Sequence, residues 1–107
     1  MTFDLATEKL RNETLTPGEL SALRMFLAAE YSYIGGLLDK VLVKKASEWI
    51  KIRERVGSDK QADRAWDASP DGMAETSYRL KLKSIEKMLS ASKSRLDIMA
   101  GEARNQY

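Results

Sequence analysis

The chain has 107 residues, a formal net charge of +2, and neither cysteine nor histidine. This composition excludes disulfide bonds and thiolate metal sites, and it removes the commonest general base and metal ligand. No apolar run reaches the length of a membrane-spanning helix, and the N-terminal residues lack an export signal. We therefore expect a cytoplasmic protein with no membrane partner.

The first expected element is a short helix that begins after Thr2 and continues to Leu10. A second and stronger helix start follows at Thr16, which suits the N-cap position. Pro17 suits the first helical position, and Glu19 at the third completes a capping box. These signals predict a small N-terminal helix followed by a long one.

The long helix is predicted by an apolar stripe at helical spacing. Four further apolar residues widen it, so one face can cover another helix and leave surface for a partner. Gly35 and Gly36 interrupt the stripe. We interpret them as residues that permit a close helix–helix approach or a gentle kink. The alternative is that they form a hinge or a backbone segment that contacts a ligand. The stripe is Leu20, Leu23, Leu27, Tyr31, Ile34, Leu38, Leu42, Ala46 and Trp49, widened by Phe26, Leu37, Val41 and Ile50.

Two more helix starts follow the stop signal at Gly57. Ser58 with Gln61 forms a second capping box, and Ser69 precedes a proline at the first position of the last helix. That helix carries a coiled-coil-like seam with alternating spacings of four and three residues. The seam is Tyr78, Leu82, Ile85, Leu89, Ser92, Leu96, Met99 and Ala103.

These elements predict an all-α fold, an antiparallel hairpin of two long helices joined by a short helical elbow. The hairpin helices span about 39 and 35 residues, and no strand pattern is present. We expect residues 1–107 to form a single elongated helical domain. Because a narrow bundle has a thin core, we also expect it to assemble into a homo-oligomeric helical bundle.

Charge is distributed in blocks of alternating sign. Residues 1–39 contain three basic and six acidic side chains, and residues 40–57 contain six and two. Residues 58–77 contain two and five, and residues 78–107 contain seven and three. In an antiparallel hairpin the two basic blocks lie near each other, at the elbow end.

This arrangement of basic helix rows with nearby aromatic rings is typical of surfaces that bind single-stranded nucleic acid. The interpretation assigns phosphate contacts to six cations and base stacking to Trp66, the ring expected to be most available. The alternative is that the charges form solvated helix faces and the rings fill the core. The predicted cations are Lys44, Lys51, Arg55, Arg79, Lys83 and Lys87.

The elbow helix carries an acidic row of Asp59, Asp63 and Asp67. Aligned carboxylates can hold a divalent cation, but this row spreads over about 12 Å and lacks a calcium-binding loop. We therefore expect no metal there, and interpret the row as a solvated face or a docking surface for a basic partner. No nucleophile has a base beside it and no phosphate-binding loop is present, so we expect neither an enzyme nor a cofactor.

Residues 58–67 and 101–107 resemble small helical proteins encoded by bacteriophages. The resemblance implies an accessory protein of the host cytoplasm that serves DNA replication or recombination, or that binds host factors, and it transfers no functional residue. Our leading hypothesis is a non-enzymatic, oligomeric accessory protein that binds nucleic acid, single-stranded DNA in particular. The alternative is a helical protein-binding module, an inhibitor or scaffold that acts on a host or phage protein.

Overall fold

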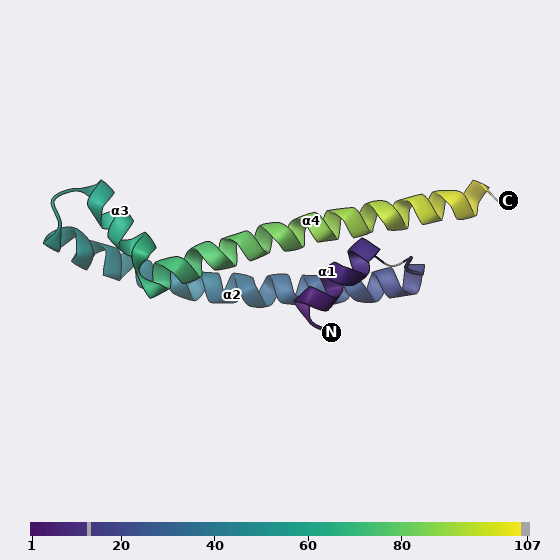
Figure 1. The fold of residues 1–107 in the computed structure, drawn as a ribbon, viewed down its shortest axis with the longest axis horizontal. Coiled ribbons are helices and arrows are strands. Elements are labelled where there is room, and N and C mark those ends of the chain that lie inside the picture. Colours follow the sequence, from purple (N-terminus) through teal and green to yellow (C-terminus); the bar gives the residue numbers. More distant parts are fainter. Residues whose placement is uncertain (13, 106–107) are drawn as a thin grey trace. The chain divides into compact units, whose positions relative to one another are not determined.

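The computed structural model describes residues 1–12 and 14–105, and it contains four α-helices and no strand among them (Figure 1). The predicted all-α fold of two long helices, a short connecting helix and a small N-terminal helix is confirmed. The last two residues of the stretch 101–107, for which a resemblance was expected, lie outside the described residues. The helices are α1 (Phe3–Asn12), α2 (Pro17–Arg55), α3 (Asp59–Ala68) and α4 (Pro70–Asn105).

The predicted helix starts are formed by the predicted side chains. At the start of α2 the Thr16 hydroxyl accepts from the Glu19 backbone N–H at 3.2 Å, and the Glu19 carboxylate accepts from the Thr16 N–H at 3.3 Å. At α3 the Ser58 hydroxyl accepts from the Gln61 N–H at 3.2 Å. At α4 the Ser69 hydroxyl accepts from the backbone N–H of Gly72, the third residue of the helix, at 3.0 Å. Each cap satisfies a donor that the helix itself leaves unpaired.

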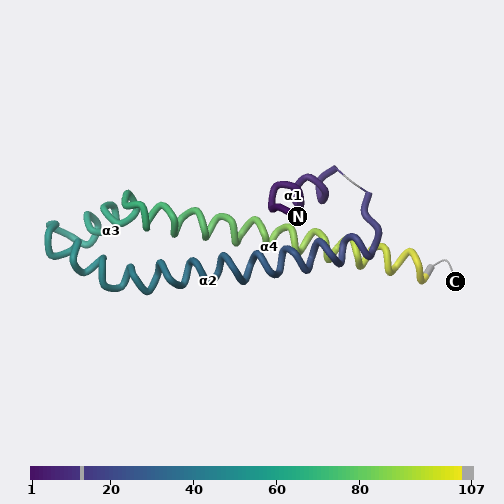
Figure 2. The backbone as a smooth tube through the Cα atoms, turned by 90° about the horizontal axis from the view of Figure 1, so that it is seen from below, coloured from purple at the N-terminus to yellow at the C-terminus, as the bar shows by residue number. Residues whose placement is uncertain are grey.

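The chain divides into two compact units, and α2 and α4 each run through both. Unit 1 comprises Met1–Ser32 and Lys83–Tyr107, and unit 2 comprises Tyr33–Leu82. In each unit, segments of α2 and α4 run side by side in opposite directions (Figure 2). The two units are described separately below, and the expectation of a single domain stays a prediction.

Unit 1 is held by apolar packing and by part-buried hydrogen bonds. The seam faces inward from Ile85 to Met99, whereas Ala103 is exposed, so the seam ends one position earlier than predicted. The Arg24 guanidinium donates to the Leu89 carbonyl at 2.6 Å and to the buried Ser92 hydroxyl at 3.0 Å. The buried apolar residues of this unit include Ala6, Leu15, Leu20, Leu23, Leu27 and Ile85.

Unit 2 is built around α3, which returns the chain from α2 to α4. Trp66 and Ala62 of α3 are buried, together with Ile34 and Leu38 of α2. Gly72 lies in the first turn of α4 and is buried against the end of α3. A Cβ atom there would overlap the Trp66 carbonyl oxygen and lie 2.6 Å from its carbon, so only glycine fits without a shift of the backbone.

The glycine pair in α2 does not mediate the close approach that we expected. The helix is continuous through Gly35 and Gly36, and a Cβ built on either would meet nothing within 4 Å. The close-approach interpretation is therefore wrong. Both residues lower the helix propensity of α2 by about 1 kcal/mol each relative to alanine without a packing benefit in the chain.

Candidate functional site

A largely buried carboxylate organises the polar contacts of unit 2. Glu75 lies near the start of α4 with its side chain only 13% exposed. Its Oε1 accepts from the Trp66 indole N–H at 3.0 Å and lies 3.1 Å from the Lys45 ammonium. Its Oε2 accepts from Arg79 at 3.0 Å. One carboxylate thus connects side chains of α2, α3 and α4.

The pKa of Glu75 reflects two opposing effects. Burial raises the pKa because it penalises the charged form, and this is the largest single influence. Hydrogen bonds from Arg79, Trp66 and Lys45, with the charge of Lys45, together outweigh it and hold the pKa below its ordinary value of 4.5. Glu75 is therefore a charged structural centre at neutral pH.

Trp66 belongs to this core and is not a free stacking platform. Its side chain is 2% exposed, its N–H is bonded to Glu75, and the Lys45 ammonium lies 5.6 Å from the ring centroid. The prediction that Trp66 offers the most available ring is wrong. The face of α3 that carries Trp66 packs against α2 and α4, which cover the ring. A nucleic-acid base has no access to it.

Most of the predicted phosphate-binding cations of unit 2 are paired with the chain's own carboxylates. Lys44 lies 3.0 Å from Asp71, Lys51 lies 3.5 Å from Glu48, and Arg79 binds Glu75. Arg55 is exposed and donates to a backbone carbonyl of its own helix. Unit 2 contains ten lysine or arginine residues and eight aspartate or glutamate residues, so its net charge is only +2.

The two remaining predicted cations, Lys83 and Lys87, belong to unit 1. Both are exposed, and the described residues provide neither with a hydrogen bond or an ion pair. Their spacing of four residues places them on one face of α4. The structure therefore gathers Lys44, Lys51, Arg55 and Arg79 with Trp66 in one unit and leaves Lys83 and Lys87 in the other.

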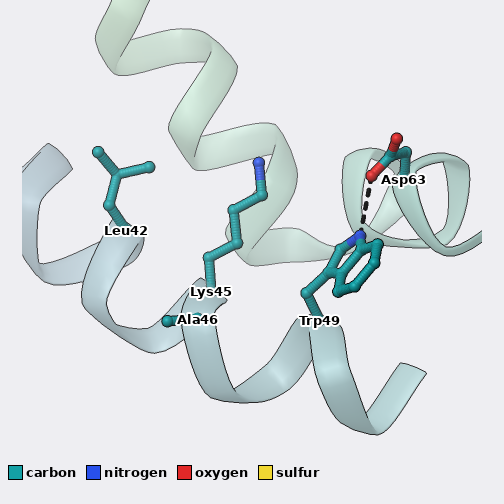
Figure 3. A pocket seen from close by; sticks show the side chains of 5 residues that line it. All are labelled: Leu42, Lys45, Ala46, Trp49 and Asp63. Carbon is teal, nitrogen blue, oxygen red and sulfur yellow. Dashed lines mark hydrogen bonds between the residues drawn. The ribbon is translucent and has the colours of Figure 1, made fainter. Parts of the chain in front are cut away.

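A pocket of about 380 Å³ opens between α2 and α3 in unit 2 (Figure 3). Leu42, Lys45, Ala46 and Trp49 of α2 line it, and Asp63 of α3 completes it. The Trp49 indole N–H donates to the Asp63 carboxylate at 2.8 Å, which fixes the ring at the edge of the pocket. Sequence reasoning missed this pocket because it took Trp49 as a core residue.

The pocket is continuous along α2 with an exposed apolar stripe. Val43 is 76% exposed and Ile50 is 56% exposed. With the pocket residues they occupy helical offsets 0, 1, 4, 7 and 8, which places them on one side of the helix. We call these five residues the outer stripe: Leu42, Val43, Ala46, Trp49 and Ile50.

Charged side chains of both signs border the outer stripe. On one side of it on α2 lies the exposed Glu54, four residues after Ile50. The exposed Lys40 and Lys51 lie farther round the helix on that side, and Lys51 pairs with Glu48. Asp63 borders the other side from α3, and Asp59 and Asp67 continue the row on that helix, each four residues away. Sequence reasoning identified the charged rows and the spare apolar width of this helix, but it did not include Val43 in the apolar surface.

Within residues 1–12 and 14–105, no group of three or more acidic side chains is placed to hold a metal ion. None of the described helices is sufficiently long and apolar to cross a membrane. Comparisons with family models, curated proteins and solved structures returned no match.

Proposed function

We propose that this chain is a non-enzymatic helical protein-interaction module and that its partner binds on the outer stripe of α2 beside α3. The observation that carries the proposal is the exposure of Val43 and Ile50 next to a pocket with a partly apolar lining. Large aliphatic side chains gain about 1.5–3 kcal/mol each when fully buried, so a partner that covers this stripe gains binding energy. A recess beside such a stripe suits an anchoring side chain.

The contacts of unit 2 favour a protein partner over nucleic acid there. Phosphate binding needs cations that are free to replace counterions, and Lys44, Lys51 and Arg79 already face carboxylates. Base stacking needs an accessible ring, and Trp66 is buried. The acidic row of α3 beside the stripe would also repel a phosphate backbone.

Site-specific photo-crosslinking tests this proposal. A photoreactive phenylalanine derivative placed at position 43 should give a covalent protein adduct on irradiation of expressing cells. The same group at position 98 of unit 1 is the matched control, because Ile98 is 60% exposed and lies off the stripe. Equal labelling from both positions, or no protein adduct from position 43, would contradict the proposal.

Nucleic-acid binding stays a second candidate on a different surface. The supporting observation is that Lys83 and Lys87 are exposed and have no partner among the described residues. If they contact phosphates, binding of labelled single-stranded DNA should weaken steeply with salt, and the double change Lys83→Glu and Lys87→Glu should abolish most of it. Absence of binding by the unaltered chain at low salt would remove this candidate, together with the role in phage recombination or replication.

A further inference from the structure

We propose that α3 is held by an acid-sensitive latch: it separates from α2 and α4 when four carboxylates of unit 2 are protonated, while unit 1 stays folded. The inference concerns unit 2 itself and does not depend on the partner proposed for the outer stripe. The four latch carboxylates are Asp59 and Asp63 of α3 and Asp71 and Glu75 of α4.

Two latch carboxylates bind α3 directly to the C-terminal part of α2. The Asp59 carboxylate accepts a hydrogen bond from the Arg53 guanidinium at 2.7 Å. The Asp63 carboxylate accepts from the Trp49 indole N–H at 2.8 Å. Protonation removes the negative charge from both acceptors, and hydrogen bonds to a charged acceptor are roughly twice as strong as those between neutral groups. Acid therefore weakens both contacts between α2 and α3.

The other two latch carboxylates fix the start of α4 against α2 and α3. Asp71 lies 3.0 Å from the Lys44 ammonium. Glu75 lies 3.1 Å from the Lys45 ammonium and accepts from the Trp66 indole N–H at 3.0 Å. Protonation leaves both lysines beside neutral groups, so the attraction that joins α2 to α4 is lost.

Glu75 contributes most to the latch, because its side chain is only 13% exposed. It faces two cations, Lys45 of α2 and Arg79 of its own helix. Burial raises the pKa of Glu75, but hydrogen bonds from Arg79, Trp66 and Lys45 outweigh burial and hold the pKa below 4.5. A carboxyl group with a lowered pKa stabilises the fold above its ordinary pKa of 4.5, and this contribution is lost as the pH falls through the lower value.

The apolar packing of α3 is concentrated in one large side chain. The helix has ten residues, and its buried side chains are Ala62 and Trp66. A helix of this length is marginal in water on its own, so α3 depends on its contacts with α2 and α4. The Trp66 N–H is itself bonded to Glu75, so the same carboxylate holds the anchor of α3 and the cation of α2.

Unit 1 is held by contacts that depend less on carboxylate charge. Arg24 and Arg95 each donate to a backbone carbonyl of another helix, and a carbonyl does not titrate. The Glu86 carboxylate accepts from the Tyr31 hydroxyl, but this contact is exposed and its donor is neutral. The core of unit 1 contains the fully buried Ile85 among its leucines. Acid should therefore release α3 before it unfolds unit 1.

An NMR titration of the intact chain tests the proposal, from neutral pH down to about pH 2.5, where free carboxyl groups are protonated. The indole N–H resonance of Trp66 reports on α3, and the methyl resonances of Ile85 report on the core of unit 1. On acidification the Trp66 resonance should move to the position that it has in urea, while the Ile85 methyl groups keep their folded shifts. Loss of both folded signals at one pH would overturn the proposal, and so would a Trp66 signal that stays at its folded position throughout.

A pair of matched variants assigns the release to the latch. Asp59→Asn with Asp63→Asn should move the midpoint of the Trp66 transition toward neutral pH by roughly half a unit or more, because two of the four charged acceptors are gone. Asp97→Asn with Glu102→Gln changes the net charge equally at two exposed positions of unit 1 and should leave the midpoint in place. Equal shifts in both variants would show that net charge drives the release, and would overturn the latch.

Discussion

The contact between the end of α3 and the start of α4 makes a sharp prediction about Gly72. Replacing it by alanine adds one methyl group against backbone atoms, 2.6 Å from the Trp66 carbonyl carbon and 2.9 Å from the Asp67 Cα. A side chain could rotate away from such a contact, but a backbone segment cannot. The last turn of α3 must therefore move, and with it the Trp66 carbonyl, which accepts from the Ser69 N–H at 2.9 Å.

The expected change in the free energy of unfolding is the sum of opposing contributions. Overpacking a tight contact costs about 1–3 kcal/mol, and disturbing the bonded carbonyl adds about 1 kcal/mol. Alanine regains about 1 kcal/mol over glycine through helix propensity. We therefore expect Gly72→Ala to destabilise the protein by about 1–3 kcal/mol. In domains of about 60–100 residues, each kcal/mol corresponds to roughly 4–8 °C in the melting temperature.

Gly35→Ala is the matched control, because the same methyl group there meets nothing within 4 Å. No described glycine has a positive φ, so alanine is compatible with the backbone at both positions. Gly35→Ala should stabilise the protein by about 0.5–1 kcal/mol. Urea unfolding followed by circular dichroism would measure both variants. A Gly72→Ala protein at least as stable as the parent would refute the tight contact between α3 and α4.

Three other changes probe separate contacts. Glu75→Gln should cost about 1–3 kcal/mol at pH 7 by urea unfolding. Because the pKa of Glu75 is lowered in the fold, the difference from the parent should shrink as the pH falls below 4.5, and a constant difference would contradict its assignment as a charged centre. The hydrogen bond to Glu86, followed by the negative charge of that residue, raises the pKa of Tyr31. Glu86→Gln should therefore return it toward 10.0 in an NMR titration, and an unchanged midpoint would exclude the contact. Ile85→Ala should cost about 2–5 kcal/mol, since its side chain is fully buried, and a smaller effect would show that unit 1 collapses around the cavity.

The features that the sequence predicted well depend on short stretches of chain. A helix cap needs residues three positions apart, and the caps at Thr16, Ser58 and Ser69 formed as expected. The seam of α4 was predictable because its spacing repeats over several turns. The roles of the two tryptophans were not predictable, since both lie at helix positions that suit burial. Trp66 is buried because α3 folds against α2 and α4, whereas Trp49 is held at the pocket edge by Asp63.

The alternating blocks of charge pair with each other in the fold. Three ion pairs between described residues, Lys44–Asp71, Lys45–Glu75 and Arg53–Asp59, join the basic block 40–57 to the acidic block 58–77. Exposed ion pairs such as Lys44–Asp71 and Arg53–Asp59 contribute only about 0–1 kcal/mol each, so these two set how α2 aligns with α3 and α4 more than they stabilise the fold. Cations used in this way are no longer free to bind phosphate. The outer stripe, which they leave uncovered on α2, is the surface on which we propose that a protein partner binds.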